Sequence, residues 1–403
     1  MTDSNADQPL MGRRSFLWTT ALLAAAPIVT EATLAQARLS DTGGVPPPDA
    51  VLINANENPL GPSKAACEAI AQIAPLGGRY DRLGQAADFQ NTFAAQHSLP
   101  ADHVAVYAGS GEPLHYTVLA FTSPSRGFVT ADPSYEAGMV AAKVAGAPIH
   151  RVPLTPAFAH DVKAMVAADP QAGVIYICNP NNPTGTITPR EDIVWALDNK
   201  PAGSILLVDE AYIHLSDEPH VLDMVAAGKD LIVLRTFSKI YGMAGIRCGV
   251  ALARPDLLAK LMAFGQNSMP VTALAAARAS LADPDLIPTR KKFIGDSRRE
   301  TIAWLKASGY KVIGDPKSNC FMIDTGRDGH GVIAAMQAQK VYIGRIWPIW
   351  PNAVRISVGT PDEMSKFRTA FKTVMDGHAM ASAAPLHPHA FTPAAAGGGI
   401  FLS

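Results

Sequence analysis

One lysine stands among hydroxyl, glycine and apolar residues in the stretch LRTFSKIYGMAGIRCG, residues 234–249. This residue is Lys239, and a second basic residue, Arg247, follows it closely. Burial and a neighbouring positive charge both favour the neutral form of a lysine amine, and the neutral amine is the nucleophile. An isolated lysine is ordinarily solvated, so the surrounding chemistry decides whether Lys239 reacts with a carbonyl group.

A candidate anion site accompanies this lysine. The segment 109–111, Gly-Ser-Gly, precedes a predicted helix and offers backbone amides and one hydroxyl, although such a segment alone is often only a turn. Thr236, Ser238 and Arg247 add hydroxyl and guanidinium donors. Together these groups predict a phosphate-binding cup.

Four further residues could bind an aromatic ring that carries this phosphate. Asp209 could keep a ring nitrogen protonated, Asn182 and Tyr212 could hydrogen-bond a ring hydroxyl, and Tyr135 could stack on the ring face. Proteins use these same means to tune pyridoxal phosphate (PLP), which a lysine holds as a Schiff base. The residues therefore predict a PLP site built around Lys239.

The clusters of candidate residues all stand at the ends of predicted strands. Short apolar runs alternate with longer helical patterns, which indicates βαβ units and a mostly parallel sheet in an α/β fold. Each chemical cluster follows directly on one of five apolar runs, at 104–107, 127–130, 174–178, 205–208 and 231–235. The carboxyl ends of parallel strands share one edge, so the clusters are expected to meet there.

Composition limits the class of protein. The chain has 403 residues, of which 48% are hydrophobic and 17% charged, enough for a large core in two associated domains. Its net charge is −1 and it has no dense run of lysine and arginine, which argues against a nucleic-acid partner. The four cysteines lie far apart without CxxC spacing, so we expect buried thiols and no metal site; they are Cys67, Cys178, Cys248 and Cys320.

The two ends of the chain differ from its middle. Residues 1–37 read as a twin-arginine signal peptide, with Arg13 and Arg14 before an apolar run and an Ala-Gln-Ala cleavage site. The apolar run is too short to span a bilayer as a helix, so we expect no membrane span in the mature protein. The paired arginines predict export after folding, to the periplasm or beyond. Residues 377–403 are rich in Ala, Gly, Pro and His and read as a disordered tail.

The motifs NPNNPTG (179–185), DEAY (209–212) and TFSKIYGMAGIRCG (236–249) together resemble the class I/II aminotransferases of fold type I. The similarity is to the branch of histidinol-phosphate aminotransferase, and it extends from NANENPLGP (54–62) to RISVGT (355–360) and beyond. It implies a seven-stranded, mostly parallel sheet in a large domain, a small α+β domain and PLP as cofactor.

The same resemblance implies a role for each candidate residue. Lys239 is then the catalytic Schiff-base lysine and Asp209 the partner of the ring nitrogen. The other implied cofactor contacts are Asn182 and Tyr212 at the ring hydroxyl, Tyr135 at the ring face, and Ser110, Gly111, Thr236, Ser238 and Arg247 at the phosphate. Tyr80 matches a tyrosine that reaches the cofactor phosphate of the partner subunit, which implies a homodimer with shared sites.

Substrate contacts are implied at three positions. Arg355 matches the arginine that binds the substrate α-carboxylate, a task suited to its bidentate fork. Arg345 stands where the family has an arginine followed by an acid, but here isoleucines, Trp347 and Trp350 surround it. Arg79-Tyr80 is likewise not followed by the Pro-Asp that is usual in the family. The resemblance also implies that Asn319 lies near the substrate. These departures favour an apolar or aromatic L-amino acid over histidinol phosphate.

The expected reaction moves an amino group between that amino acid and a 2-oxo acid through Lys239. A PLP-dependent decarboxylase or lyase would use the same cofactor residues, and a regulatory or scaffold protein that has lost catalysis is a third reading.

The predicted organisation is an N-terminal segment at 38–75 that joins the small domain, a large PLP-binding domain at 76–283 and the small C-terminal domain at 284–376. The helix in the N-terminal segment should bury Ala66, Ala69, Ile70 and Ile73 on one face.

Overall fold

The structure is a computed structural model that describes residues 45–265 and 268–377. The predicted signal peptide, and the predicted tail beyond residue 377, lie outside the described residues. Of the helices in these ranges, none is long and apolar enough to cross a membrane.

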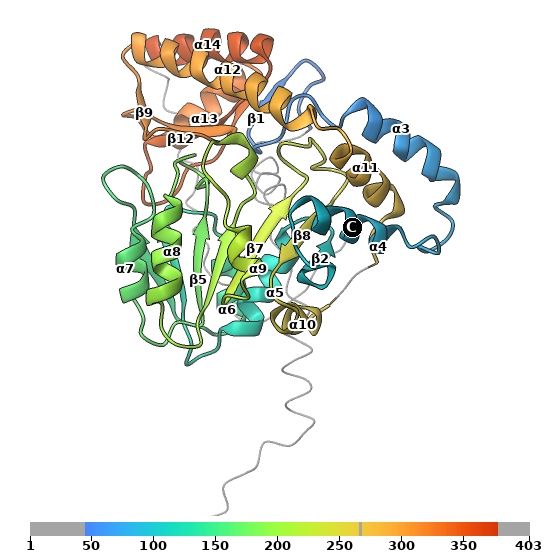
Figure 1. The fold of residues 1–403 in the computed structure, drawn as a ribbon. Helices are drawn as coiled ribbons and strands as arrows, with labels where there is room; N and C mark the ends of the chain where they lie inside the picture. Colours follow the sequence, from blue (N-terminus) through green and yellow to red (C-terminus); the bar gives the residue numbers. More distant parts are fainter. Residues whose placement is uncertain (1–44, 266–267, 378–403) are drawn as a thin grey trace, which may run out of the picture.

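A seven-stranded sheet forms the centre of the larger part, in the order β2-β8-β7-β6-β5-β3-β4 (Figure 1). β8 runs antiparallel to both of its neighbours, and the other paired strands are parallel. This confirms the predicted α/β fold with a mostly parallel sheet. The strands are β2 (Val104–Tyr107), β3 (Phe128–Asp132), β4 (Ile149–Pro153), β5 (Val174–Cys178), β6 (Ile205–Asp209), β7 (Leu231–Thr236) and β8 (Gly249–Leu252).

Both faces of this sheet are covered, which explains why its central strands are apolar throughout. Side chains alternate between two core layers, so that Ile175 and Ile177 enter one layer while Val174 and Tyr176 enter the other. The first layer packs on α4 (Gln85–Gln96), α7 (Val162–Ala167), α8 (Arg190–Asn199), α9 (Leu222–Ala226) and α11 (Val271–Leu281). The second packs on α5 (Gly111–Phe121), α6 (Ala137–Val144) and α10 (Pro255–Met262).

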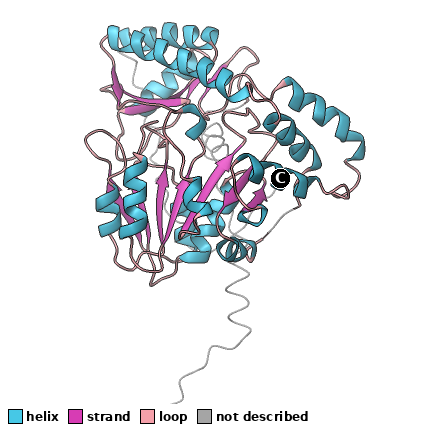
Figure 2. Ribbon diagram, in the orientation of Figure 1, coloured by secondary structure: helices cyan, strands magenta, loops and turns pink. Residues whose placement is uncertain are grey.

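Two small sheets form the rest of the fold. β1 (Val51–Ile53) pairs in parallel with β11 (Val341–Ile343), and β12 (Ala353–Ser357), β10 (Cys320–Asp324) and β9 (Lys311–Ile313) form an antiparallel sheet in that order. Their helices are α12 (Leu286–Ala307), α13 (Gly329–Ala338) and α14 (Pro361–Asp376). The arrows of β5 and β7 point toward this part, so it lies over the carboxyl edge of the large sheet (Figures 1 and 2).

The predicted apolar face of the first described helix is confirmed. In α3 (Lys64–Ile73), Ala66 is buried and Ala69, Ile70 and Ile73 are partly buried, while the other residues of the helix are exposed. The face packs against α11. The expectation of four buried thiols was wrong for Cys67, because it lies beside Ala66 but on the exposed side of the helix; the other three cysteines are buried.

Short 3-10 turns complete the connections; they are η1 (Ala74–Leu76), η2 (Ala101–His103) and η3 (Ile213–Leu215). The N-terminal segment contacts both parts, since β1 pairs with β11 whereas α3 packs on α11. The domain boundaries inferred at residues 76, 284 and 377 therefore stay predictions.

A buried ion pair joins the ends of two central strands. Glu210, directly after β6, accepts hydrogen bonds from Nε and Nη2 of Arg235 in β7, at 2.9 and 2.8 Å. Its other carboxylate oxygen accepts the backbone N–H of Val221 at 3.0 Å. Glu210 and Arg235 flank Asp209 and Thr236, so the pair fixes the strand ends that present these two predicted cofactor contacts.

We expect Glu210→Ala to lower the free energy of unfolding by about 3–5 kcal/mol, because it leaves the Arg235 charge buried without its carboxylate. Urea denaturation of purified protein measures the change. Glu300→Ala is the matched control, since the pair of Glu300 with Arg368 is exposed and should contribute less than about 1 kcal/mol. Equal losses in the two variants would contradict the role given to the buried pair.

Candidate active site

Lys239 lies just beyond the end of β7 and is almost fully buried. Its Nζ donates a hydrogen bond to the backbone carbonyl oxygen of Asn56 at 2.9 Å and lies 5.4 Å from the centre of the Tyr212 ring. The Tyr212 hydroxyl accepts a hydrogen bond from the Asn56 side-chain amide at 3.1 Å. The amine is therefore held inside the protein at the carboxyl edge of the sheet.

Asp209 is the last residue of β6, and its carboxylate is buried beneath the same edge. It accepts hydrogen bonds from the Tyr176 hydroxyl at 3.0 Å and from the Ala211 backbone N–H at 3.1 Å. Burial raises the pKa of Asp209 to about 6, while these hydrogen bonds and the charge of Lys239 oppose the rise. A cationic ring nitrogen placed against this carboxylate would restore its negative charge.

Hydroxyl and guanidinium donors gather at the start of α5. Ser110 is the residue before this helix, and its side chain does not cap the helix. Across from it, the Thr236 hydroxyl donates to Ser238 Oγ at 2.9 Å. Arg247 Nη1 lies 3.5 Å from the same Ser238 oxygen, and Arg247 Nη2 donates to the carbonyl oxygen of Ala108 at 3.0 Å. The predicted phosphate contacts are thus brought together.

Two glycines allow this close approach. A Cβ atom at Gly109 would lie 2.2 Å from Arg247 Nη2, and Gly109 also has a φ of +97°, which disfavours other residues. A Cβ atom at Gly249 would lie 2.7 Å from the Ser110 backbone nitrogen. The donors converge only because neither position carries a side chain.

Arg355 is fully buried in β12 and reaches from the smaller part to the large sheet. Its Nη1 donates to Asn182 Oδ1 at 2.9 Å and its Nη2 donates to the carbonyl oxygen of Asn54 at 2.6 Å. A contact with Asn182 places this guanidinium beside a predicted contact of the cofactor ring. This is the place where an arginine would bind the carboxylate of an amino acid.

Arg345 has an acidic partner that the sequence reading did not foresee. Both of its terminal nitrogens donate to the carboxylate of Glu136, at 2.5 and 2.6 Å. Glu136 follows Tyr135 in the loop after β3, far from Arg345 in the sequence. The sequence places isoleucines and tryptophans around Arg345, and the fold supplies an acid from another segment.

Besides Glu136, sequence reasoning missed two residues of the site. The carbonyl oxygen of Asn56 accepts a hydrogen bond from Lys239, and its side-chain amide donates one to Tyr212. In the sequence, Asn56 was only one member of a longer motif and had no role of its own. Tyr176 supports Asp209, and the alternation within β5 could have revealed it, because Tyr176, Cys178 and Asp209 share one face of the sheet once β5 and β6 are paired.

Three other predicted residues lie in different surroundings. Asn319 is buried and its amide donates to the Asn56 carbonyl oxygen at 3.0 Å, which brings it next to Lys239. Tyr135 is partly buried in the core layer that contains Tyr176. Tyr80, by contrast, is 86% exposed and is not among the buried side chains around Lys239.

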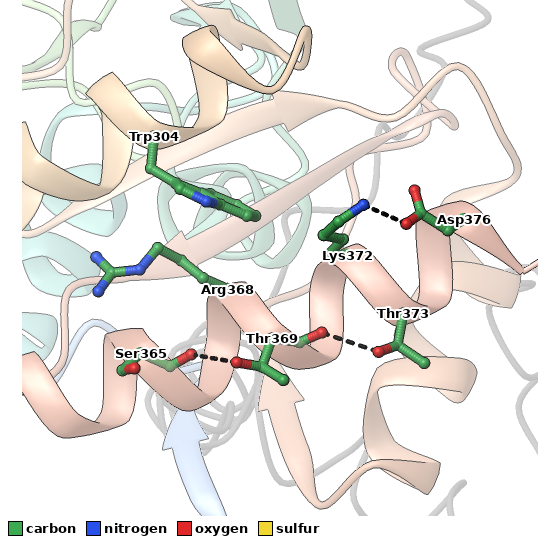
Figure 3. Close-up of a pocket in the computed structure, with 7 residues that line it drawn as sticks. All are labelled: Trp304, Ser365, Arg368, Thr369, Lys372, Thr373 and Asp376. Carbon is green, nitrogen blue, oxygen red and sulfur yellow. Dashed lines mark hydrogen bonds and ion pairs between the residues drawn. The ribbon is translucent and has the colours of Figure 1, made fainter.

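A groove elsewhere on the surface does not compete with this site. It lies between α12 and α14, beneath Trp304 (Figure 3). Its charged groups already pair, Arg368 with Glu300 and Lys372 with Asp376, and the hydroxyls of Thr369 and Thr373 bond carbonyls of their own helix. None of the predicted site residues lines it.

The chain matches the family described as aminotransferase class I and II over residues 48–371. It belongs to this family. It is 32% identical to the aromatic amino acid aminotransferase of Cutibacterium acnes over 335 residues, 82% of this chain and 94% of that protein. It is also 32% identical to the histidinol-phosphate aminotransferase of Symbiobacterium thermophilum over 336 residues, 81% of this chain and 91% of that protein.

A solved structure supports the same assignment. The histidinol-phosphate aminotransferase from Sinorhizobium meliloti, in complex with pyridoxal-5'-phosphate, superposes with a TM-score of 0.76 at 25% identity and covers 88% of this chain and 96% of that one. The protein is thus a PLP-dependent aminotransferase of fold type I.

The residues present fit this cofactor. The donors around Ser110 and Arg247 suit a phosphate, the buried carboxylate of Asp209 suits a protonated ring nitrogen, and the Lys239 amine suits an aldehyde carbon. Asn182 and Tyr212, the predicted contacts of a ring hydroxyl, belong to the same cluster, since they contact Arg355 and Asn56.

We expect Asp209→Asn to lower kcat by about 100-fold, because the uncharged amide no longer stabilises the protonated ring nitrogen.

PLP affinity of the wild type should fall as the pH drops below about 6. Burial raises the pKa of Asp209 to this value, so the carboxylate is neutral at lower pH.

Absorbance titration with PLP between pH 5 and pH 8 measures this affinity, and the acid-side fall should vanish in Asp209→Asn. Asp223→Asn, at an exposed pair with Arg190, is the control that should retain it. An unchanged pH profile in Asp209→Asn would remove Asp209 from this role.

Proposed function

We propose that this aminotransferase takes an aromatic L-amino acid as its amino donor and a 2-oxo acid as its acceptor. The observation that carries the proposal is the position of Trp347, whose ring centre lies 4.2 Å from the guanidinium carbon of Arg345 and 5.5 Å from that of Arg355. An aromatic ring therefore lies beside the arginine suited to the substrate carboxylate. The similarity to an aromatic amino acid aminotransferase supports the same donor class.

Each of the residues in the site then has a separate role in the reaction. Arg355 binds the α-carboxylate and, with Asn182, sets the orientation of the substrate Cα–H bond. With PLP bound, the Lys239 amine would move a proton from the substrate Cα to the cofactor in one half-reaction and from the cofactor to Cα in the other. Asp209 holds the proton on the ring nitrogen. Bound PLP supplies an electrophilic carbon for the amino group and a ring that accepts electrons.

Histidinol phosphate is a second candidate donor, because one relative of equal identity carries that name. A phosphate would need a cationic partner, and Arg345 is the cation beside Trp347. The bidentate pairing of Arg345 with Glu136 opposes this use. We therefore place histidinol phosphate after the aromatic amino acids.

A screen of single L-amino acids and histidinol phosphate against the PLP-loaded protein tests the donor class. We expect phenylalanine, tyrosine or tryptophan to convert the bound cofactor to its pyridoxamine form, seen by stopped-flow absorbance, and Lys239→Ala to abolish the conversion. Conversion by histidinol phosphate alone would refute the aromatic assignment. Release of carbon dioxide without pyridoxamine would instead establish a decarboxylase.

We also propose a homodimer in which Tyr80 reaches the cofactor phosphate of the partner subunit. Its 86% exposure supports the proposal together with that of Leu76 and Leu83, at 50% and 66%, because a group of exposed apolar side chains is typical of an interaction surface. Mixing Tyr80→Ala subunits with Lys239→Ala subunits should recover about one quarter of wild-type activity, since half of the random dimers hold one intact site. No recovery in dimers verified by light scattering would place Tyr80 outside the shared site.

Export by the twin-arginine route remains a proposal supported by Arg13, Arg14 and the following apolar run. Folding and PLP loading would then precede transport. N-terminal sequencing of protein recovered outside the cytoplasm tests the expected start of the mature chain after Ala37, and retention of an Arg13→Lys/Arg14→Lys variant tests the route.

A further inference from the structure

Two loops from distant parts of the chain meet beside the candidate active site. Glu136 lies at the start of α6, directly after Tyr135, and Arg345 lies just beyond β11. The two side chains form a bidentate ion pair with distances of 2.5 and 2.6 Å. The Arg345 side chain is 7% exposed and that of Glu136 is 22% exposed, so the pair is largely withdrawn from water.

Trp347 connects this ion pair to the carboxylate-binding arginine. Its indole N–H donates to the carbonyl oxygen of Ser134 at 3.0 Å, which fixes the ring against the loop that carries Glu136. The ring centre lies 4.2 Å from the Arg345 guanidinium carbon and 5.5 Å from that of Arg355. Both guanidinium groups therefore lie close to the same indole ring.

Gly344 holds the two arginines in this relation. A Cβ atom at Gly344 would lie 3.0 Å from Arg355 Nε and 2.8 Å from the Arg355 carbonyl oxygen. The loop that carries Arg345 therefore rests directly on Arg355. We expect an amino acid whose α-carboxylate binds Arg355 to extend its side chain toward the Glu136–Arg345 pair.

We propose that Glu136 determines substrate specificity by occupying Arg345. This inference rests on the proposed function and deepens it. An acidic side chain or a phosphate must displace Glu136 to pair with Arg345, and the displaced carboxylate then loses two charge-assisted hydrogen bonds in a site largely closed to water. An uncharged aromatic side chain leaves the pair intact. Glu136 thereby selects against acidic substrates, a form of discrimination by repulsion.

Equilibrium binding of two unreactive carboxylates tests this selection without relying on amino transfer. The ligands are 3-phenylpropanoate, which has an aromatic end, and glutarate, which has a second carboxylate. Isothermal titration is carried out with the PLP-loaded wild type and Glu136→Gln. We expect glutarate to bind Glu136→Gln about tenfold more tightly than it binds the wild type, because Arg345 is released. Binding of 3-phenylpropanoate should change less than about twofold, because it needs no displacement.

Three further variants identify the cause. Glu136→Gln/Arg345→Gln should lose the gain for glutarate, because the released cation is gone. Glu136→Asp keeps the negative charge and should keep the discrimination, which separates charge from a general disturbance of the loop. Glu300→Gln removes a carboxylate from an exposed pair with Arg368 and should leave both affinities unchanged.

Unchanged glutarate affinity in Glu136→Gln, or an equal gain for both ligands, would overturn the inference. Because neither ligand transfers an amino group, these affinities report on Glu136 even where no aromatic amino acid reacts. A wild type that binds 3-phenylpropanoate but transfers no amino group from aromatic amino acids would refute the proposed donor class alone.

Discussion

The carbonyl oxygen of Asn56 is the point on which the site depends. It accepts hydrogen bonds from Lys239 Nζ at 2.9 Å and from Asn319 Nδ2 at 3.0 Å, and so joins the N-terminal segment to the loop after β7 and to the residue before β10. The backbone of Asn56 is left-handed, with a φ of +54°, and Ser357 fixes it by bonding both its N–H and its side-chain oxygen. An asparagine tolerates this conformation better than most residues. The buried amine therefore has a defined acceptor, and both parts of the fold contribute to it.

Charge is balanced locally along the buried edge of the sheet. Asp209 has Tyr176 and Ala211 as donors, and Glu210 has Arg235. Burial, followed by the charge of Arg235, lowers the pKa of His97 to about 3, so this histidine adds no positive charge near the pair at neutral pH. The edge can thus hold ionisable groups away from water because each charge has a nearby partner, which limits the cost of burying it.

Sequence patterns predicted the central strands well because their cause is local. Continuous apolar runs at 174–178 and 205–208 fall on β5 and β6. The edge strand β4, with its partly exposed Ile-His-Arg-Val-Pro, has no such run and was missed. The residues of the candidate site were identified mainly through motifs, and the parallel topology explains why they meet. Asn56 and Glu136 could not be assigned in this way, since their contacts depend on how separate segments pack.

Glu136 shows why a residue's neighbours in sequence can mislead about its charge environment. Around Arg345 the chain reads Ile-Gly-Arg-Ile-Trp, which suggests a cation in an apolar setting. The fold instead brings Glu136 to both guanidinium nitrogens and places the Trp347 ring 4.2 Å away. An arginine paired in this way can bind an anionic ligand only after its internal partner is displaced. The strength of the internal pair therefore sets the preference between anionic and uncharged ligands. Selectivity at this position is therefore a property of the contact between two loops rather than of the arginine alone.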